Sequence, residues 1–443
     1  MKIILAIGIG ILFFVLGEMF FTLQQSALLG SIAFLVTLWT NEALPLGVVS
    51  LLPIVLFPAL GITDTKMTAI NYANPIIYLF FGGFLLAIAV EKTNLHLHVT
   101  HKLLAIFPAT PRGMIFSLAT ISALLSAILS NTTTTLLLIS IAIFLTQNVR
   151  LKTRFALAIA YGASIGGIIT PIGTPPNLIL LGVMQEHNIQ LIPFFQWIVM
   201  TAPLSFIMLL CMGFLLSYKV NDIPIVVDIE KKVLDKAQKK VIFLILGLIV
   251  LLVINTPIKP YWSGLGLSES GILLGFGLAL FMPPFSILNW DEDSKKVPYA
   301  IMFLFGAGFS IAKAFLQTGL ADELASYLLH ITHLPPLLLL LSVAVLITFT
   351  TEITSNTALI SIMLPVIYSV SQHSDIDAIL FMMVATLCSS YAFMLPIATP
   401  PNAIAMSSGA VNVKDMLRYG VVLNLLGIFF IVIIASYFWK NIL

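Results

Sequence analysis

Charged residues are scarce in this sequence. Only 9% of its 443 residues are Asp, Glu, Lys or Arg, whereas 59% are hydrophobic, and the mean hydropathy is +1.08. A soluble domain carries roughly 25% charged residues, because its surface faces water. The composition therefore excludes a soluble protein and predicts a chain embedded in a lipid bilayer.

An excess of one charge and an abundance of cysteine are also missing. The 21 basic and 19 acidic residues nearly cancel, so the net charge is +2 and the basic field that a nucleic-acid partner requires is absent. The only two cysteines, Cys211 and Cys388, lie in separate apolar runs, which argues against a disulfide framework and a cysteine-based metal cluster. We expect neither a nucleic-acid partner nor redox chemistry.

Long apolar runs dominate what is present. A helix needs about 20 apolar residues to cross a bilayer. About eleven runs qualify: 2–21, 26–40, 46–60, 76–91, 157–184, 197–218, 240–256, 267–285, 297–316, 378–406 and 418–439. Two more, 113–146 and 337–370, are too long for one crossing, and a Ser-Asn-Thr cluster interrupts each. We predict an all-α polytopic membrane protein with about eleven transmembrane helices and two re-entrant hairpins.

The few basic residues orient this topology. With the N-terminus inside and each hairpin returning to its own side, seventeen Lys and Arg residues fall in cytoplasmic loops. Only Lys66, Lys259 and Lys440 fall outside, and Lys313 falls within a span. Cytoplasmic loops of membrane proteins carry such an excess of basic residues. We therefore predict a multi-pass protein of the plasma (inner) membrane with a cytoplasmic N-terminus and an extracytoplasmic C-terminus.

An internal repeat runs through the chain at one fixed offset of 225 residues. The matching segments are 78–95 with 303–320, 130–132 with 355–357, and 171–177 with 396–402. The first hairpin is predicted on the cytoplasmic side and the second outside, so the two halves are inverted, as in many secondary transporters. We predict a first repeat over 1–218 with an extra N-terminal span, a cytoplasmic linker over 219–239 and a second repeat over 240–443.

The hairpin tips carry the first functional motif. Ser130-Asn131-Thr132 lies within a charge-free run, and Ser and Asn are good N-caps, so the cluster is expected to begin the returning half-helix. The first amides of that half-helix and its dipole then form an anion site. The carbonyls that end the incoming half-helix, together with the Ser126 and Ser130 hydroxyls and the Asn131 amide oxygen, suit a hard cation such as Na⁺.

The second motif breaks two spans. Residues 173–177 read Gly-Thr-Pro-Pro-Asn, and 398–402 read Ala-Thr-Pro-Pro-Asn. A residue before proline avoids helical dihedrals, and proline cannot donate to the preceding turn. Broken helices over 157–184 and 378–406 are therefore expected to free carbonyls beside a cation. Two tips and two broken helices would surround one central anion.

Isolated polar residues in apolar surroundings leave alternatives open. Lys313 and Glu352 are intramembrane charges, with either a functional role or a role as a structural pair. His96, His98 and His101 are interpreted as the polar face of an interfacial helix rather than a metal site.

These paired motifs, with Glu42 and Pro45 after Trp39, resemble the divalent anion/sodium symporter family of di- and tricarboxylate or sulfate carriers, over essentially the whole chain. The resemblance implies that substrate is bound by Ser130, Asn131, Thr132, Thr174, Pro175, Ser355, Asn356, Thr357, Thr399 and Pro400. It implies two Na⁺ sites, formed by Ser126, Ser130, Asn131 and Gly173, and by Thr351, Thr354, Asn356 and Ala398. It also implies a homodimer in which a transport domain slides against a scaffold in an elevator motion.

The leading hypothesis is a Na⁺-coupled carrier of a small dianionic carboxylate of the succinate, malate or fumarate type. A sodium-independent dicarboxylate or citrate exchanger and a sulfate carrier remain alternatives, and so does an anion channel. A membrane enzyme is the least supported class, because no nucleophile and base occur together.

Overall fold

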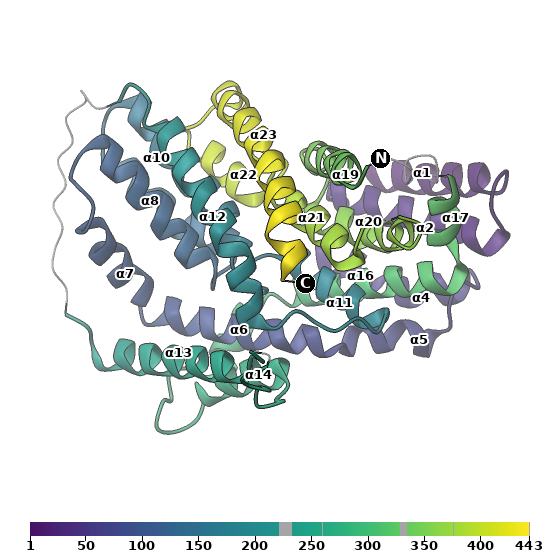
Figure 1. Ribbon diagram of the computed structural model, residues 1–443, viewed down its shortest axis with the longest axis horizontal. Helices are drawn as coiled ribbons and strands as arrows, with labels where there is room; N and C mark the ends of the chain where they lie inside the picture. The colour runs from purple at the N-terminus through teal and green to yellow at the C-terminus, as the bar shows by residue number, and fades with distance from the viewer. Residues whose placement is uncertain (221–232, 259, 328–334, 375, 443) are drawn as a thin grey trace.

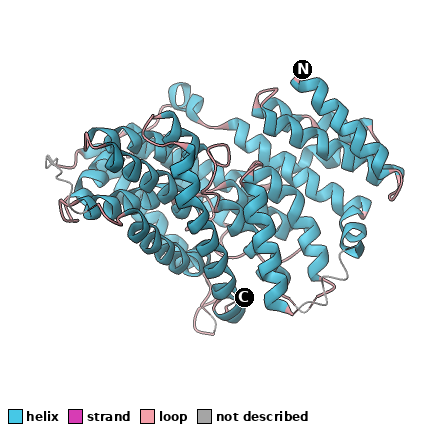
Figure 2. Ribbon diagram, turned by 90° about the horizontal axis from the view of Figure 1, so that it is seen from above, coloured by secondary structure: helices cyan, strands magenta, loops and turns pink. Residues whose placement is uncertain are grey.

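The computed structural model describes residues 1–443 except 221–232, 259, 328–334, 375 and 443. Throughout these described residues the chain forms helices and connecting loops, and the one β-type contact is an isolated bridge between Ile258 and Trp262 (Figure 2).

The helices fall into two series along the chain (Figure 1). The first comprises α1 (Lys2–Gly17), α2 (Leu23–Asn41), α3 (Leu46–Leu51), α4 (Pro53–Ala59), α5 (Thr65–Ile70), η1 (Asn71–Ala73), α6 (Pro75–Lys92), α7 (Leu95–Leu104), α8 (Pro111–Ser126), α9 (Asn131–Phe144), α10 (Val149–Gly167), α11 (Pro175–Glu186) and α12 (Phe194–Leu216). The second comprises α13 (Lys236–Asn255), α14 (Glu269–Ala279), α15 (Trp290–Asp293), η2 (Ser294–Lys296), α16 (Tyr299–Thr318), α17 (Leu320–Tyr327), α19 (Pro336–Thr351), α20 (Asn356–Ser371), α21 (Ala378–Ser390), α22 (Pro400–Ser407), α23 (Val413–Tyr437) and η3 (Trp439–Asn441).

The apolar runs of the sequence form helices, with shorter bounds in several places. Within the described ranges, six helices are long and apolar enough to cross a membrane: Leu23–Asn41, Thr65–Lys92, Phe194–Leu216, Lys236–Asn255, Tyr299–Thr318 and Val413–Tyr437. The expected span 267–285 is helical only in α14, since Pro283 and Pro284 follow closely and proline cannot continue a helix. Helix α13 begins at Lys236, inside the expected linker, because Asp235 forms a capping box with Gln238.

The helix breaks repeat at the offset seen in the sequence. Helices α8 and α19 begin at residues 111 and 336, α9 and α20 at 131 and 356, and α11 and α22 at 175 and 400. Each of these three pairs is 225 residues apart, so equivalent capping and proline residues start equivalent helices.

Two groups of helices surround these breaks. Helix α2 packs against α1, α3, α4 and α16, while α6 packs against α13 and α14. In the other group α10 packs against α8, α9, α12 and α22, and α21 packs against α19, α20 and α23. Helices α16 and α17 contact α20, and α16 also contacts α11, so these four helices join the groups.

Small residues allow the closest of these contacts. A Cβ on Gly166 of α10 would lie 2.2 Å from the Ala123 carbonyl oxygen of α8, and a Cβ on Gly82 of α6 would lie 2.4 Å from the Leu273 carbonyl oxygen of α14. Glycine therefore lets the backbones approach, as is common between helices in membranes.

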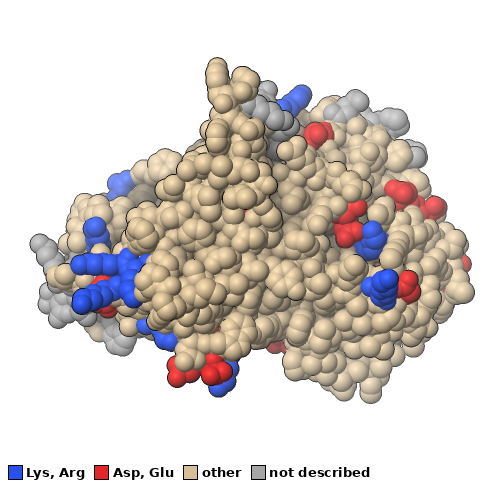
Figure 3. All heavy atoms as spheres, turned by 90° about the horizontal axis from the view of Figure 1, so that it is seen from below, with Lys and Arg blue, Asp and Glu red and all other residues tan. Residues whose placement is uncertain are grey.

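The outer surface is largely uncharged. On the face drawn in Figure 3, Lys, Arg, Asp and Glu gather in a few places and uncharged residues cover the rest. Large apolar side chains such as Phe206, Phe243 and Leu346 are more than half exposed. Such an exterior suits contact with lipid rather than water.

Candidate functional site

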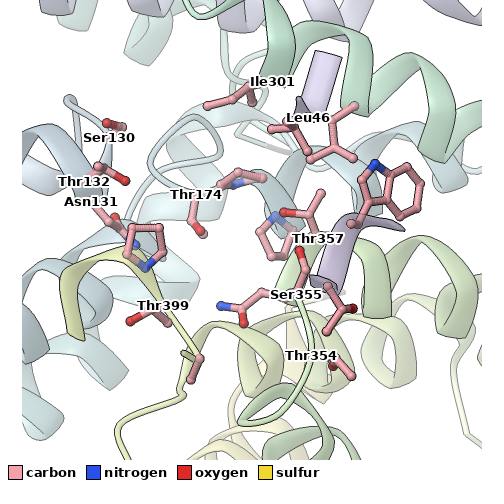
Figure 4. A pocket seen from close by; sticks show the side chains of 18 of the residues that line it. Leu46, Ser130, Asn131, Thr132, Thr174, Ile301, Thr354, Ser355, Thr357 and Thr399 are labelled. Carbon is pink, nitrogen blue, oxygen red and sulfur yellow. The ribbon is translucent and has the colours of Figure 1, made fainter. Parts of the chain in front are cut away.

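A cavity of about 720 Å³ lies where four helices begin. Its wall includes the first residues or N-caps of α9, α11, α20 and α22. Figure 4 shows Ser130, Asn131 and Thr132 on one side and Thr354, Ser355 and Thr357 on the other, with Thr174 and Thr399 nearer the first group. The structure thus brings ten residues expected to bind substrate to one cavity: Ser130, Asn131, Thr132, Thr174, Pro175, Ser355, Asn356, Thr357, Thr399 and Pro400.

The two hairpin tips present amide donors to this cavity. Ser130 is the N-cap of α9, and its Oγ accepts a hydrogen bond from the Thr133 amide at 3.2 Å. Ser355 caps α20, and its Oγ accepts from the Ala358 amide at 3.5 Å. The first-turn amides of each helix have no intrahelical acceptor and lie at the positive end of the helix dipole. Both tips are therefore suited to binding an anionic group.

The two broken helices contribute differently. Thr174 is extended (φ −146°, ψ 145°) before α11, and Thr399 is extended (φ −141°, ψ 148°) before α22. Two prolines occupy the first positions of each helix and have no amide donor. These loops therefore offer hydroxyl and carbonyl oxygens, and the amide donors come from the hairpin tips.

One asparagine braces each unwound segment. Asn177 Nδ2 donates to the carbonyl oxygens of Gly167 at 3.2 Å and Thr170 at 2.9 Å. Asn402 Nδ2 donates to the carbonyl oxygens of Ala392 and Leu395, each at 3.0 Å. The two braces are equivalent at the offset of the repeat, so the loops that approach the cavity are held in the same way in both halves.

The Asn131 side chain faces a cluster of oxygens. Its amide contacts Ser126 Oγ at 2.5 Å, the Ala163 carbonyl oxygen at 3.2 Å and the Gly173 carbonyl oxygen at 3.3 Å. With the amide nitrogen toward them, Asn131 donates to all three; with the amide oxygen toward them, four oxygens converge. Hard cations bind such oxygen sets. Three of the four residues expected at the first Na⁺ site meet here, while Ser130 lies at the neighbouring cap; Ala163 was not anticipated.

The second half has a related cluster. Thr351 Oγ1 lies 2.6 Å from Asn356 Oδ1 and 3.0 Å from the Ser389 carbonyl oxygen, so three oxygens converge. Thr354 and Ala398 line the cavity, and Thr354 Oγ1 donates to the Thr350 carbonyl oxygen at 2.9 Å. Ser126 and Thr351 are fully buried behind the cavity wall rather than in it.

Charge at the site is minimal. Glu42 is the one charged residue among those that line the cavity, and none of the lining residues is Lys or Arg. An anion here would be bound by helix amides, hydroxyls and side-chain amides.

The two intramembrane charges do not pair with each other. Lys313 Nζ lies 2.9 Å from Glu186 Oε2 at the end of α11. The Glu352 carboxylate is 2% exposed and accepts from the Met394 amide at 2.9 Å, the Leu395 amide at 3.0 Å and Asn424 Nδ2 at 2.6 Å. The interpretation of Lys313 and Glu352 as a structural pair is wrong, because packing gives each a different partner.

The histidines also depart from expectation. His96 is buried on α7 and its Nδ1 lies 3.4 Å from the Val90 carbonyl oxygen, so it does not belong to an exposed polar face. Burial lowers the pKa of His96. His98 and His101 are half-buried.

Part of the cavity wall escaped the sequence. It comes from Trp39 and Thr40 of α2, the α2–α3 connection, Phe80 of α6 and Ile301 and Leu304 of α16. Most of these residues are apolar and carry no motif. The one local signal is Glu42, whose left-handed backbone (φ 50°) is uncommon for a residue other than glycine.

Relatives of known function match most of the chain. A family model described as a citrate transporter matches residues 32–386. The sodium-dependent dicarboxylate transporter SdcS of Staphylococcus saprophyticus is 30% identical, over 90% of this chain and 83% of that protein. SdcS of Staphylococcus aureus is 30% identical, over 98% of this chain and 91% of that protein.

Two solved transporter structures share the fold. The YdaH transporter of Alcanivorax borkumensis has a TM-score of 0.60 at 15% identity, over 83% of this chain and 87% of that one. MtrF of Neisseria gonorrhoeae has a TM-score of 0.61 at 12% identity, over 96% of this chain and 97% of that one. The predicted all-helical membrane-transporter fold is thereby confirmed, whereas the number of spans and the inverted repeat stay predictions.

Proposed function

Because the chain belongs to the divalent anion/sodium symporter family, we propose that it couples Na⁺ movement to the transport of C4-dicarboxylates such as succinate, malate or fumarate. Members of this family are transporters, and the protein is not an enzyme. The observation that carries the proposal is one cavity with an amide-bearing tip on each side, an oxygen cluster beside each tip and no Lys or Arg in its wall. Two separated tips match the two carboxylates of one substrate.

Sodium has a physical role in such a site. A dianion in a membrane interior without fixed positive charge is costly. A cation at each oxygen cluster, formed by Ser126, Asn131 and Gly173 or by Thr351 and Asn356, would place positive charge beside each tip and lower that cost.

An elevator motion is the proposed means of access. The tips and broken helices belong to the group that contains α8–α12 and α19–α23, while α1–α6 and α13–α17 form the other. Polar contacts between the groups are Lys313 with Glu186, Ser369 with Asp322, and the Phe194 amide with Glu269. By the proposed topology all three lie at extracytoplasmic ends, and the cavity wall from the α2–α3 connection lies toward the cytoplasm. We propose an inward-facing state of a homodimeric carrier in the plasma (inner) membrane.

Uptake of labelled succinate into proteoliposomes tests the function. We expect uptake that requires an inward Na⁺ gradient and is competed by malate and fumarate. Uptake that ignores Na⁺ but requires internal dicarboxylate would instead establish an exchanger, and competition by sulfate alone would establish a sulfate carrier. Ion currents far faster than carrier turnover would establish a channel.

Gly167→Ala is expected to weaken Na⁺ binding at the first oxygen cluster. A Cβ on Gly167 would lie 2.5 Å from Asn131 Oδ1, so the Asn131 side chain must move away from Ser126 and Gly173. Overpacking of this kind costs roughly 1–3 kcal/mol, which corresponds to about tenfold more Na⁺ at half-maximal uptake. Gly8→Ala is the matched control, because nothing lies within 4 Å of its added Cβ. Unchanged Na⁺ dependence in Gly167→Ala would argue against a cation at Asn131.

A further inference from the structure

The indole of Trp39 is buried without a hydrogen-bond partner. Trp39 lies on α2, is 8% exposed and lines the cavity, and within the described part of the chain its Nε1–H meets no acceptor. The other two fully buried indoles are satisfied, because Trp197 Nε1 donates to the Ile168 carbonyl oxygen at 3.0 Å and Trp439 Nε1 to the Met200 carbonyl oxygen at 2.9 Å. A buried donor without an acceptor is unfavourable and calls for an explanation.

The neighbouring cavity wall does not supply the acceptor. On this side of the cavity the wall includes Leu46, Phe80, Ile301 and Leu304, whose side chains have no polar atom. Glu42 follows three residues after Trp39, but it has left-handed backbone and its carboxylate does not accept from the indole. The remaining place for an acceptor is the cavity itself.

We propose that Trp39 Nε1–H donates a hydrogen bond to a carboxylate oxygen of the bound substrate. The proposal rests on the function proposed above for this cavity. An indole N–H only donates, so it recognises an anion and not a cation. Hydrogen bonds from a neutral donor to a carboxylate are stronger than those between neutral groups. In a wall without Lys or Arg, Trp39 adds one donor to the amides of the two hairpin tips.

The position of Trp39 makes this bond specific to one state of the carrier. Helix α2 packs against α1, α3, α4 and α16, whereas the tips at Asn131 and Asn356 belong to the other group. When the tips and substrate move relative to α2, the bond to Trp39 must break. Trp39 therefore strengthens substrate binding in the orientation described here and not in the opposite one.

Trp39→Phe tests the proposal, because it removes the N–H and keeps an aromatic ring. With purified protein in saturating Na⁺ and succinate as the probe, we expect the Kd to rise about tenfold. In proteoliposomes of uniform orientation, we expect the KM to rise at the cavity-facing side and to change less at the opposite side. Trp290→Phe is the matched control, since its indole is 51% exposed and outside the cavity.

A merely structural role gives a different result. If a fixed internal partner held the indole, Trp39→Phe would lower the unfolding temperature without succinate and leave the Kd unchanged. We expect the opposite, with unaltered stability in the absence of succinate and a smaller rise in unfolding temperature on adding it. A Kd within twofold of the wild type overturns the proposal even if the wild type binds succinate. A wild type that binds none of succinate, citrate and sulfate overturns the proposed function and this inference together.

Discussion

Asn131→Ala and Asn356→Ala are each expected to reduce Na⁺-driven succinate uptake by about a hundredfold. Each asparagine begins a half-helix at a hairpin tip, lines the cavity and contributes its side-chain amide to an oxygen cluster. Alanine removes a cation ligand and leaves Ser126 Oγ or Thr351 Oγ1 without its partner. A loss of about 3 kcal/mol, typical of an interaction with a charged group, corresponds to roughly a hundredfold.

Both variants are expected to remain folded, since Ser130 and Ser355 still cap α9 and α20. Size-exclusion chromatography and thermal unfolding check this, and Ser140→Ala is the matched control because Ser140 lies on the exposed side of α9. If either asparagine variant transports at the wild-type rate, the assignment of the tips to the transport site is wrong.

Local chemistry made the helix breaks predictable. Ser130 and Ser355 follow apolar runs and cap the next helix, while Thr174 and Thr399 precede proline pairs and are extended. These outcomes depend on a residue and its immediate neighbours, so one sequence was enough to locate them.

Contacts between distant segments were not predictable in the same way. The pairing of Lys313 with Glu186 joins α16 to α11, and the approach of Ala163 to Asn131 joins α10 to α9. The exposure and partners of Trp39 depend on how α2 meets the hairpin group. Such contacts follow from helix packing, for which no spacing in the sequence provides a rule.

The two halves differ in one charge. Glu352 occupies the position equivalent to Ala127 at the offset of the repeat. In the first half, Thr170 Oγ1 donates to the Ala127 carbonyl oxygen at 2.5 Å. In the second half, the Glu352 carboxylate instead accepts from the amides of Met394 and Leu395. Loops that are braced alike by Asn177 and Asn402 are therefore anchored by neutral groups in one half and by a carboxylate in the other.

The contacts of Glu352 fit an anion. Among the described residues, those that hydrogen-bond its carboxylate are donors, namely Met394, Leu395 and Asn424, whereas a protonated carboxyl would need an acceptor for its own O–H. Glu352 also follows Thr351 directly in sequence. A fixed negative charge there favours a cation at the second oxygen cluster over the first.

Glu352→Gln is expected to raise the Na⁺ concentration for half-maximal uptake at least tenfold and to remove most of the thermal stabilisation that Na⁺ confers. It removes the charge and turns an amide donor toward the Met394 or Leu395 amide, at a cost of about 1–3 kcal/mol. The double variant Glu352→Gln/Asn424→Asp returns one negative charge to the same buried cluster, where Asn424 Oδ1 already accepts from the Phe393 amide at 3.2 Å. We expect it to recover most of the Na⁺ affinity, whereas Glu186→Gln, at the partly exposed pair with Lys313, should leave Na⁺ affinity near the wild-type value. If the double variant is folded but its Na⁺ affinity stays as low as that of Glu352→Gln, then Glu352 acts by holding residues 393–395 in place and not by its charge.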